Sequence, residues 1–247
     1  MIASELMSKK LVVSNYNSDL EWLKMTHDNG FSADNTIIYD RSSIKKNWSH
    51  LGKTISSPNI GGNQYDVLRF IIENYDDLPN ISIFIKGNLF SKSEENYYTT
   101  KERFIQGLNE NTFFSLWVDK CLALNDFRHL TYTTRESLDN GRLSQPIHHC
   151  DFSTNHNLEH RFFSRVHDLW DWCFTNSPKH NTIEFIPACN FVVPKNIILK
   201  YSVNLYKKLL SILFDPESSN DPTCAESHLI ERTFYFMWNN DLSERVD

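Results

Sequence analysis

The sequence predicts an α/β fold, in which helices flank a mostly parallel sheet and the C-terminal portion is helical. The first 90 residues alternate in the order strand, helix, strand, helix, strand, which implies a parallel sheet with right-handed crossovers. The C-terminal part contains two segments with the apolar spacing of amphipathic helices. With 247 residues, of which 40% are hydrophobic and 23% charged, the chain can form one large domain around a single core.

The N-terminal segments support this order one by one. Residues 11–13 are a short apolar strand, and Ser18 with Glu21 three positions later is a capping-box signature for the helix that follows. We expect Gly30 to end that helix, because glycine adopts the left-handed conformation of a C-cap without strain. Residues 36–39 form the second predicted strand.

The next segments complete the alternation. Residues 42–62 are polar and are expected to form a loop. Residues 65–77 carry apolar side chains at helical spacing, and Pro79 cannot continue the helix. Residues 81–85, with the sequence ISIFI, form the third predicted strand.

The second half of the chain is less regular. Residues 125–164 are polar and rich in histidine, so we expect loops and short elements there. Residues 185–193 alternate as a strand does, residues 196–214 have the pattern of one amphipathic helix, and residues 226–238 form a last helix rich in aromatic side chains.

Composition excludes several classes of protein. The net charge is −6 and the lysine pairs are isolated, whereas a nucleic-acid-binding protein usually carries a basic surface; we therefore expect no nucleic-acid partner. Five cysteines without a C-x-x-C motif argue against a disulfide framework and favour reduced thiols in the cytoplasm. No segment approaches the roughly 18 apolar residues of a membrane span. We expect a cytoplasmic protein that can still contact the inner face of a membrane peripherally.

Polar side chains follow each of the three predicted strands. In a parallel sheet these positions meet at one edge, where ligands bind to α/β proteins. The alternative is that Asp40 begins a turn and Arg41 is solvated, and the sequence leaves the two interpretations evenly balanced. The candidates for ligand binding at this edge are Asn15, Tyr16, Asp40, Arg41, Lys86 and Asn88.

Two other segments carry candidate site residues. Asn59 and Gly61 precede a helix and could let the backbone approach a phosphate, although a plain loop fits the spacing better. The last helix begins with Glu226, His228 and Glu231, which could supply a general base; the alternative is a capped surface helix.

Residues 156–160 spell H-x-x-E-H, the order of ligands and base in one class of zinc protease. On a helix, His156 and His160 would share a face and Glu159 could activate water. The surrounding sequence is only partly helix-like, and ten histidines make a chance match easy. A chance match is therefore favoured over a zinc protease.

Taken together, these segments resemble a family of uncharacterised fungal, bacterial and viral domains that look like GT-A-type glycosyltransferases, which have a Rossmann-like fold. Residues 12–23, VVSNYNSDLEWL, are similar to the family's V-x-x-Y-N-x-D-L-x-W-L opening. Residues 58–61 and 65–87 are similar to its P-N-x-G and Y-x-x-x-I-I-x-N-Y-D-x-L-P-x-x-x-I-F-x-Q-G patterns, with Lys86 in place of glutamine. Residues 228–232 are similar to its H-x-x-E-R helix, and residues 91–180 hardly match.

The resemblance implies one domain over residues 1–247 that transfers a sugar from a nucleotide-sugar donor to a glycan or lipid-linked glycan. It implies a nucleotide-binding half at 1–90, a variable insertion at 91–180 and an acceptor side at 181–247. Glu226, His228 and Glu231 are then candidate catalytic residues. The donor-binding candidates are Asn15, Tyr16, Asp19, Asp40, Arg41, Asn59, Gly61, Lys86, Asn88 and Arg232.

The resemblance also implies a manganese or magnesium ion, held by an Asp-x-Asp motif after the third strand. Here that position is Lys86-Gly87-Asn88, so no metal ligand is predicted from these residues. Lys86 could neutralise a diphosphate directly. The alternatives are a non-catalytic nucleotide- or sugar-binding module on the same fold, or the zinc-dependent hydrolase of residues 156–160.

Overall fold

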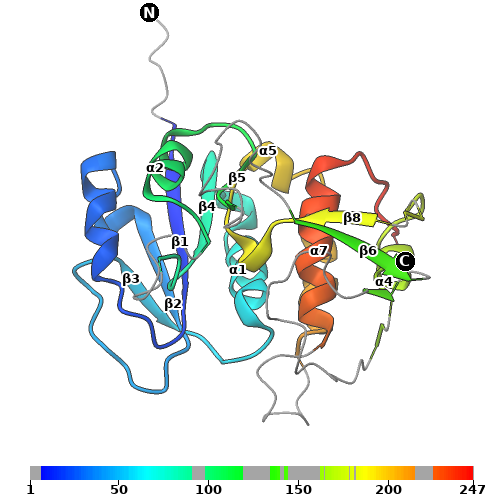
Figure 1. The fold of residues 1–247 in the computed structure, drawn as a ribbon, viewed down its shortest axis with the longest axis horizontal. Helices are drawn as coiled ribbons and strands as arrows, with labels where there is room; N and C mark the ends of the chain where they lie inside the picture. The colour runs from blue at the N-terminus through cyan, green and yellow to red at the C-terminus, as the bar shows by residue number, and fades with distance from the viewer. Residues whose placement is uncertain are drawn as a thin grey trace, which may run out of the picture.

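The computed structural model describes residues 7–90, 98–118, 134–139, 142–143, 162–163, 165–177, 179–180, 182–214 and 225–246. Its main element is a six-stranded mixed sheet in the order β3-β2-β1-β4-β9-β5, in which β3, β2, β1 and β4 are parallel (Figure 1). β9 pairs antiparallel with both β4 and β5. The strands are β1 (Lys9–Asn15), β2 (Thr36–Asp40), β3 (Lys53–Ser56), β4 (Ile81–Lys86), β5 (Phe114–Ser115) and β9 (Phe191–Pro194).

The parallel half of this sheet confirms the predicted α/β class. β1, β2 and β4 coincide with the three predicted strands. β3 lies within residues 42–62, for which the sequence predicts a loop. The reason is that β3 is an edge strand whose Lys53, Thr54 and Ser56 are exposed, so it lacks the apolar pattern of a buried strand.

The first crossover is a 3-10 helix, η1 (Glu21–Asn29), rather than a helix capped by Ser18. Its N-cap is Leu20, which makes no side-chain capping bond, so the capping-box prediction is wrong. Ser18 instead donates its backbone N–H to Asn15 Oδ1 at 3.2 Å, which ties it to the turn after β1. Gly30 ends η1 with φ 83°, as predicted.

The second crossover is α1 (Gly62–Glu73), which joins β3 to β4. The η1 crossover leads from β1 outward to β2, whereas the α1 crossover runs back past β1 to β4. Because these right-handed connections run in opposite directions, they place η1 and α1 on opposite faces of the sheet. The other helices of the N-terminal half are η2 (Ala33–Asn35), η3 (Tyr75–Asp77) and α2 (Lys101–Asn109).

The C-terminal part differs from the sequence prediction at two places. The expected strand 185–193 is two strands, β8 (Thr182–Phe185) and β9, separated by the 3-10 turn η6 (Pro187–Cys189). The expected helix 196–214 is α5 (Lys195–Ile198) and α6 (Val203–Ser211). Ser202 caps α6 by accepting the N–H of Leu205, which explains the break.

The helix α7 (Ala225–Asn239) confirms the last predicted helix and lies between the large sheet and a small antiparallel sheet (Figure 1). The small sheet has the order β7-β6-β8, with β6 at Thr134–Asp139 and β7 at Arg142–Leu143. α4 (Val166–Cys173) packs on α7, where the rings of Trp170 and Phe236 stack at 3.6 Å.

A chain of aromatic contacts fills the core between α1, the sheet and α7. Phe70 of α1 packs edge-on against Phe84 of β4 at 5.6 Å, and Phe84 packs against Phe191 of β9 at 5.8 Å. Phe191 then contacts Trp238 of α7 at 5.0 Å. All four side chains are buried, so α7 is fixed to the same core as the parallel strands. Among the described helices, none is long and apolar enough to span a membrane.

Candidate functional site

The carboxyl ends of the three predicted strands meet at one edge of the sheet, which we call the rim. β1 ends at Asn15, which is in register with Asp40 at the end of β2. Ser14, one residue earlier on β1, is in register with Lys86 at the end of β4. The connections leave β1 and β4 in opposite directions, and the crevice at such a switch point is where open α/β sheets bind ligands.

Asn15 and Asp40 form a buried polar network at the centre of the rim. Asn15 Nδ2 donates to Asp40 Oδ1 at 3.1 Å and to Ser42 Oγ at 3.3 Å. Ser42 donates its backbone N–H to the same Asp40 oxygen at 3.1 Å. The other oxygen, Asp40 Oδ2, lies 3.7 Å from Lys45 Nζ. Asp40 is 1% exposed, so its carboxylate is held by the protein itself.

Arg41 is buried beside the rim and is held by two residues of α1. Its Nη2 donates to Asn63 Oδ1 at 2.8 Å, and its Nε lies 3.3 Å from Asp66 Oδ2. Ser57 Oγ donates to the other Asp66 oxygen at 2.5 Å. Burial raises the pKa of Asp66 to about 6, although Arg41 and the Ser57 hydrogen bond act in the opposite direction.

Lys86 adds a further cation to the rim. Its Nζ donates to Tyr98 Oη at 3.1 Å and lies 5.2 Å from the centre of the Tyr98 ring. Burial lowers the pKa of Lys86, while the charge of Glu231 opposes that change and the charge of Arg41 adds to it. The fields of Arg41 and Glu231 therefore both reach this amine, which places residues of the N-terminal half and of α7 in one electrostatic cluster.

Glu231 joins this cluster through the turn η6. Its Oε1 accepts the N–H of Ala188 at 2.6 Å, and its Oε2 lies 2.6 Å from Arg232 Nη1. The guanidinium of Arg232 stacks on Phe185, with 3.9 Å between its central carbon and the ring centre. Asn63 donates to the carbonyl of Ala188 at 3.0 Å, so η6 connects α7 with α1.

The other base candidates lie near the start of α7. Glu226 is fully buried, and its Oε1 accepts the backbone N–H of Phe162 at 2.9 Å. His228 is partly buried, and its carbonyl accepts a hydrogen bond from Arg232 at 3.3 Å. The contacts of the described residues thus connect Glu231 with the rim, while Glu226 is bonded to a different segment.

Several predicted ligand-binding residues are placed differently from Asp40 and Arg41. Tyr16 is 50% exposed, and both Asp19 and Asn59 are exposed. Gly61 has φ 58°, and a Cβ there would lie 2.9 Å from a methyl group of Leu213. Packing against Leu213 therefore explains this glycine, and its role in phosphate binding stays a prediction.

Gly87 and Asn88 follow β4 directly. A Cβ on Gly87 would lie 2.6 Å from Asn15 Oδ1, so the glycine is required by the close approach of β1 and β4. The carbonyl of Gly87 accepts a hydrogen bond from the Trp22 indole at 2.9 Å. Asn88 is partly buried, and its Oδ1 has no hydrogen-bond partner among the described residues.

The sequence did not reveal Asn63 and Asp66. They are three residues apart and therefore share one face of α1, and Phe70 follows Asp66 at the next turn. Asp66 thus lies on the same face of the helix as the apolar Phe70. This position could have indicated from the sequence that the carboxylate is buried and needs a cationic partner.

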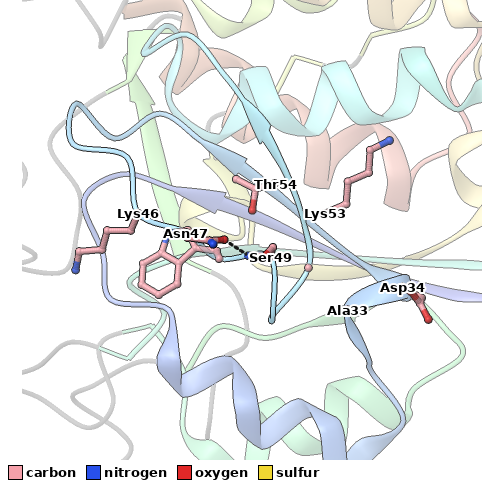
Figure 2. Close-up of a pocket in the computed structure, with 9 residues that line it drawn as sticks. Ala33, Asp34, Lys46, Asn47, Ser49, Lys53 and Thr54 are labelled. Atoms are coloured by element: carbon pink, nitrogen blue, oxygen red, sulfur yellow. Dashed lines mark hydrogen bonds between the residues drawn. The ribbon is translucent and has the colours of Figure 1, made fainter.

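A surface depression in the described part of the chain lies away from the rim. It has a volume of about 500 Å³ and is formed by residues 33–34, 46–49 and 52–54, next to the amino ends of β2 and β3. Figure 2 shows that Lys46 and Lys53 point in opposite directions from it. Because its polar groups diverge and lie at the opposite edge from the rim, we do not assign it as the site.

A metal site finds no support in the described ranges, which contain no group of three histidine, cysteine, aspartate or glutamate side chains arranged to hold an ion. The H-x-x-E-H motif of His156, Glu159 and His160 lies outside the described residues, and the zinc hypothesis stays a prediction.

The fold and the rim define the chain as an α/β protein with a mostly parallel sheet and a cluster of buried charges at the strand ends. The chain belongs to the family described as a protein of unknown function (DUF3431), whose model matches residues 11–245. Neither the comparison with curated proteins nor the comparison with solved structures gave a match.

Proposed function

We propose that the protein is a glycosyltransferase with a GT-A-like fold, which moves a sugar from a nucleotide-sugar donor to a glycan or lipid-linked acceptor. The observation that carries this proposal is the convergence of Asp40, Arg41, Lys86 and Glu231 at the rim from three separate segments, the end of β2, the end of β4 and α7. Buried charges gathered at the carboxyl ends of parallel strands are a feature of ligand sites in this class of fold.

In this proposal the cations of the rim replace the metal ion. A nucleotide-sugar donor carries a diphosphate, or a single phosphate in the CMP-sugars, whose negative charge increases as the sugar leaves, and fixed positive charges stabilise that change. Lys86 supplies a point charge, and Arg41 supplies a planar guanidinium that matches phosphate oxygens. Asn15 and Asp40 would bind the nucleoside with their amide and carboxylate. A proposed base on α7, Glu226 or His228, would accept the proton of the acceptor hydroxyl.

Donor binding is tested by thermal unfolding in the presence of UDP-, GDP- and CMP-sugars, with manganese or with a chelator. A ligand at 100 times its Kd stabilises the native state by about 2.7 kcal/mol. For a chain of this size each kcal/mol raises Tm by roughly 2–4 °C. We expect one nucleotide class to raise Tm by several degrees without manganese, whereas no shift with any nucleotide under either condition would refute the donor assignment.

The second candidate is a non-catalytic nucleotide- or sugar-binding module on the same fold. It is favoured by the lack of a carboxylate at residues 86–88, where the resemblance implies a metal-binding Asp-x-Asp motif. Release of the free nucleotide, which is UDP, GDP or CMP, from a bound nucleotide sugar distinguishes the two. Turnover supports the transferase, and binding without turnover supports the module.

A further inference from the structure

The turn η6 has an unusual backbone at a position next to the rim. Ala188 and Cys189 have φ values of 58° and 54°, in the left-handed region that residues with a Cβ seldom adopt. Two such residues in succession persist only where the surrounding structure holds them in place. The question is which contacts hold this turn.

Side chains from two helices hold the Ala188 backbone, one on each side. Glu231 of α7 accepts the Ala188 N–H at 2.6 Å, and Asn63 of α1 donates to the Ala188 carbonyl at 3.0 Å. The second oxygen of Glu231 is bonded to Arg232, which is itself stacked on Phe185. The pairing with Arg232 therefore fixes the Glu231 carboxylate in the position from which it accepts the Ala188 N–H.

The same contacts continue to the rim. The amide of Asn63 donates through Nδ2 to Ala188 and accepts through Oδ1 from Arg41 Nη2 at 2.8 Å. An amide has one donor side and one acceptor side, so both bonds can form only in a single orientation of Asn63. A change in the η6 turn would thus alter the bond that orients the Arg41 guanidinium.

We propose that Glu231 is a positioning residue rather than the catalytic base, because it holds the Ala188–Cys189 turn and, through Asn63, orients Arg41 toward the donor's diphosphate. The role of Arg41 in this inference rests on the proposed function. The hydrogen bonds by which Glu231 and Asn63 hold the Ala188 backbone, which we call the clamp, do not depend on it. A carboxylate whose two oxygens each accept a short hydrogen bond is poorly suited to take up a proton, since those bonds favour its charged form.

Glu231→Gln and Glu231→Ala separate positioning from base catalysis. Glutamine keeps an oxygen that can accept the Ala188 N–H but cannot serve as a base, whereas alanine removes the acceptor. We expect hydrogen exchange at the Ala188 amide to be slow in the wild type and in E231Q and fast in E231A. Exchange in E231A as slow as in the wild type would overturn the clamp.

Asn63→Asp tests the clamp from the other side, in case E231A does not fold. Aspartate still accepts from Arg41 but cannot donate to the Ala188 carbonyl, so we expect faster exchange at Ala188. Wild-type exchange in N63D would also contradict the clamp. Glu73→Gln is the matched control, because Glu73 pairs with Arg69 on the exposed side of α1.

Inorganic pyrophosphate, titrated by calorimetry, tests the link to Arg41. We expect E231Q to bind it within about threefold of the wild type and E231A roughly tenfold more weakly, a difference of about 1.4 kcal/mol. Equal losses in E231Q and E231A would overturn the positioning role. If the wild type binds no pyrophosphate, the proposed donor site fails, while the exchange rates still decide whether Glu231 holds the turn.

Discussion

Replacing Asp66 with asparagine tests whether burial or the pairing with Arg41 dominates the charge of this carboxylate. Asp66 is fully buried, 3.3 Å from Arg41 Nε, and burial raises its pKa from 3.8 to about 6. A raised pKa in the folded state means that the neutral form is favoured there. The protonated Asp66 side chain therefore contributes its full share to the free energy of unfolding below pH 3.8, and this contribution is lost as the pH rises through about 6.

The magnitude follows from the two pKa values. The difference between 3.8 and about 6, at about 1.4 kcal/mol per pKa unit, gives a total of about 3 kcal/mol, of which about 2 kcal/mol falls between pH 4 and pH 7. Asparagine resembles the protonated side chain and does not titrate. The free energy of unfolding of Asp66→Asn, measured relative to that of the wild type, should therefore increase by about 2 kcal/mol from pH 4 to pH 7.

Urea unfolding of both proteins at pH 4 and pH 7 measures this difference. Comparing the two proteins at each pH cancels the titration of all other groups and any fixed effect of the asparagine. If pairing with Arg41 dominated, the pKa would be lowered and D66N would instead lose stability as the pH rises. A pH-independent difference, or one of that opposite sign, would refute the assignment of burial as the dominant effect.

Two further predictions concern packing. Gly87→Ala places a Cβ 2.6 Å from Asn15 Oδ1 and should destabilise the protein by about 1–3 kcal/mol in urea unfolding, so an unchanged midpoint would show that the rim is looser than described. Phe191→Ala should destabilise by about 3–5 kcal/mol, because Phe191 contacts both Phe84 and Trp238 in the core. Phe162→Ala, at a 56% exposed position, is its control and should change stability by less than about 0.5 kcal/mol.

Hydrophobic patterns predicted the parallel half of the sheet because β1, β2 and β4 are buried on both faces and read as continuous apolar runs. The same reasoning missed β3, since an edge strand with Lys53 and Thr54 exposed has no such run. It also merged β8 with β9 and α5 with α6. In both places a local signal, Pro187 or the N-cap Ser202, outweighed the periodicity of the longer segment.

The candidate site was predictable to the extent that it depends on strand ends. Asp40, Arg41 and Lys86 follow strands whose order the alternation implies, so their meeting at one edge could be anticipated. Asn63, Asp66 and the η6 turn could not, because their roles come from tertiary contacts. Nothing in the local sequence of α1 shows that a carboxylate on its buried face will meet Arg41, or that Asn63 will bond to the backbone 125 residues away.

We propose that the rim binds a nucleotide sugar through Lys86 without a metal ion. The most direct test of this claim is calorimetric titration of UDP-, GDP- and CMP-sugars into the wild type and Lys86→Met, with a chelator present. We expect one nucleotide class to bind the wild type and to bind K86M at least about tenfold more weakly, a difference of about 1.4 kcal/mol. Equal affinity for the two proteins, or no binding heat with any of the three donors, would contradict the claim.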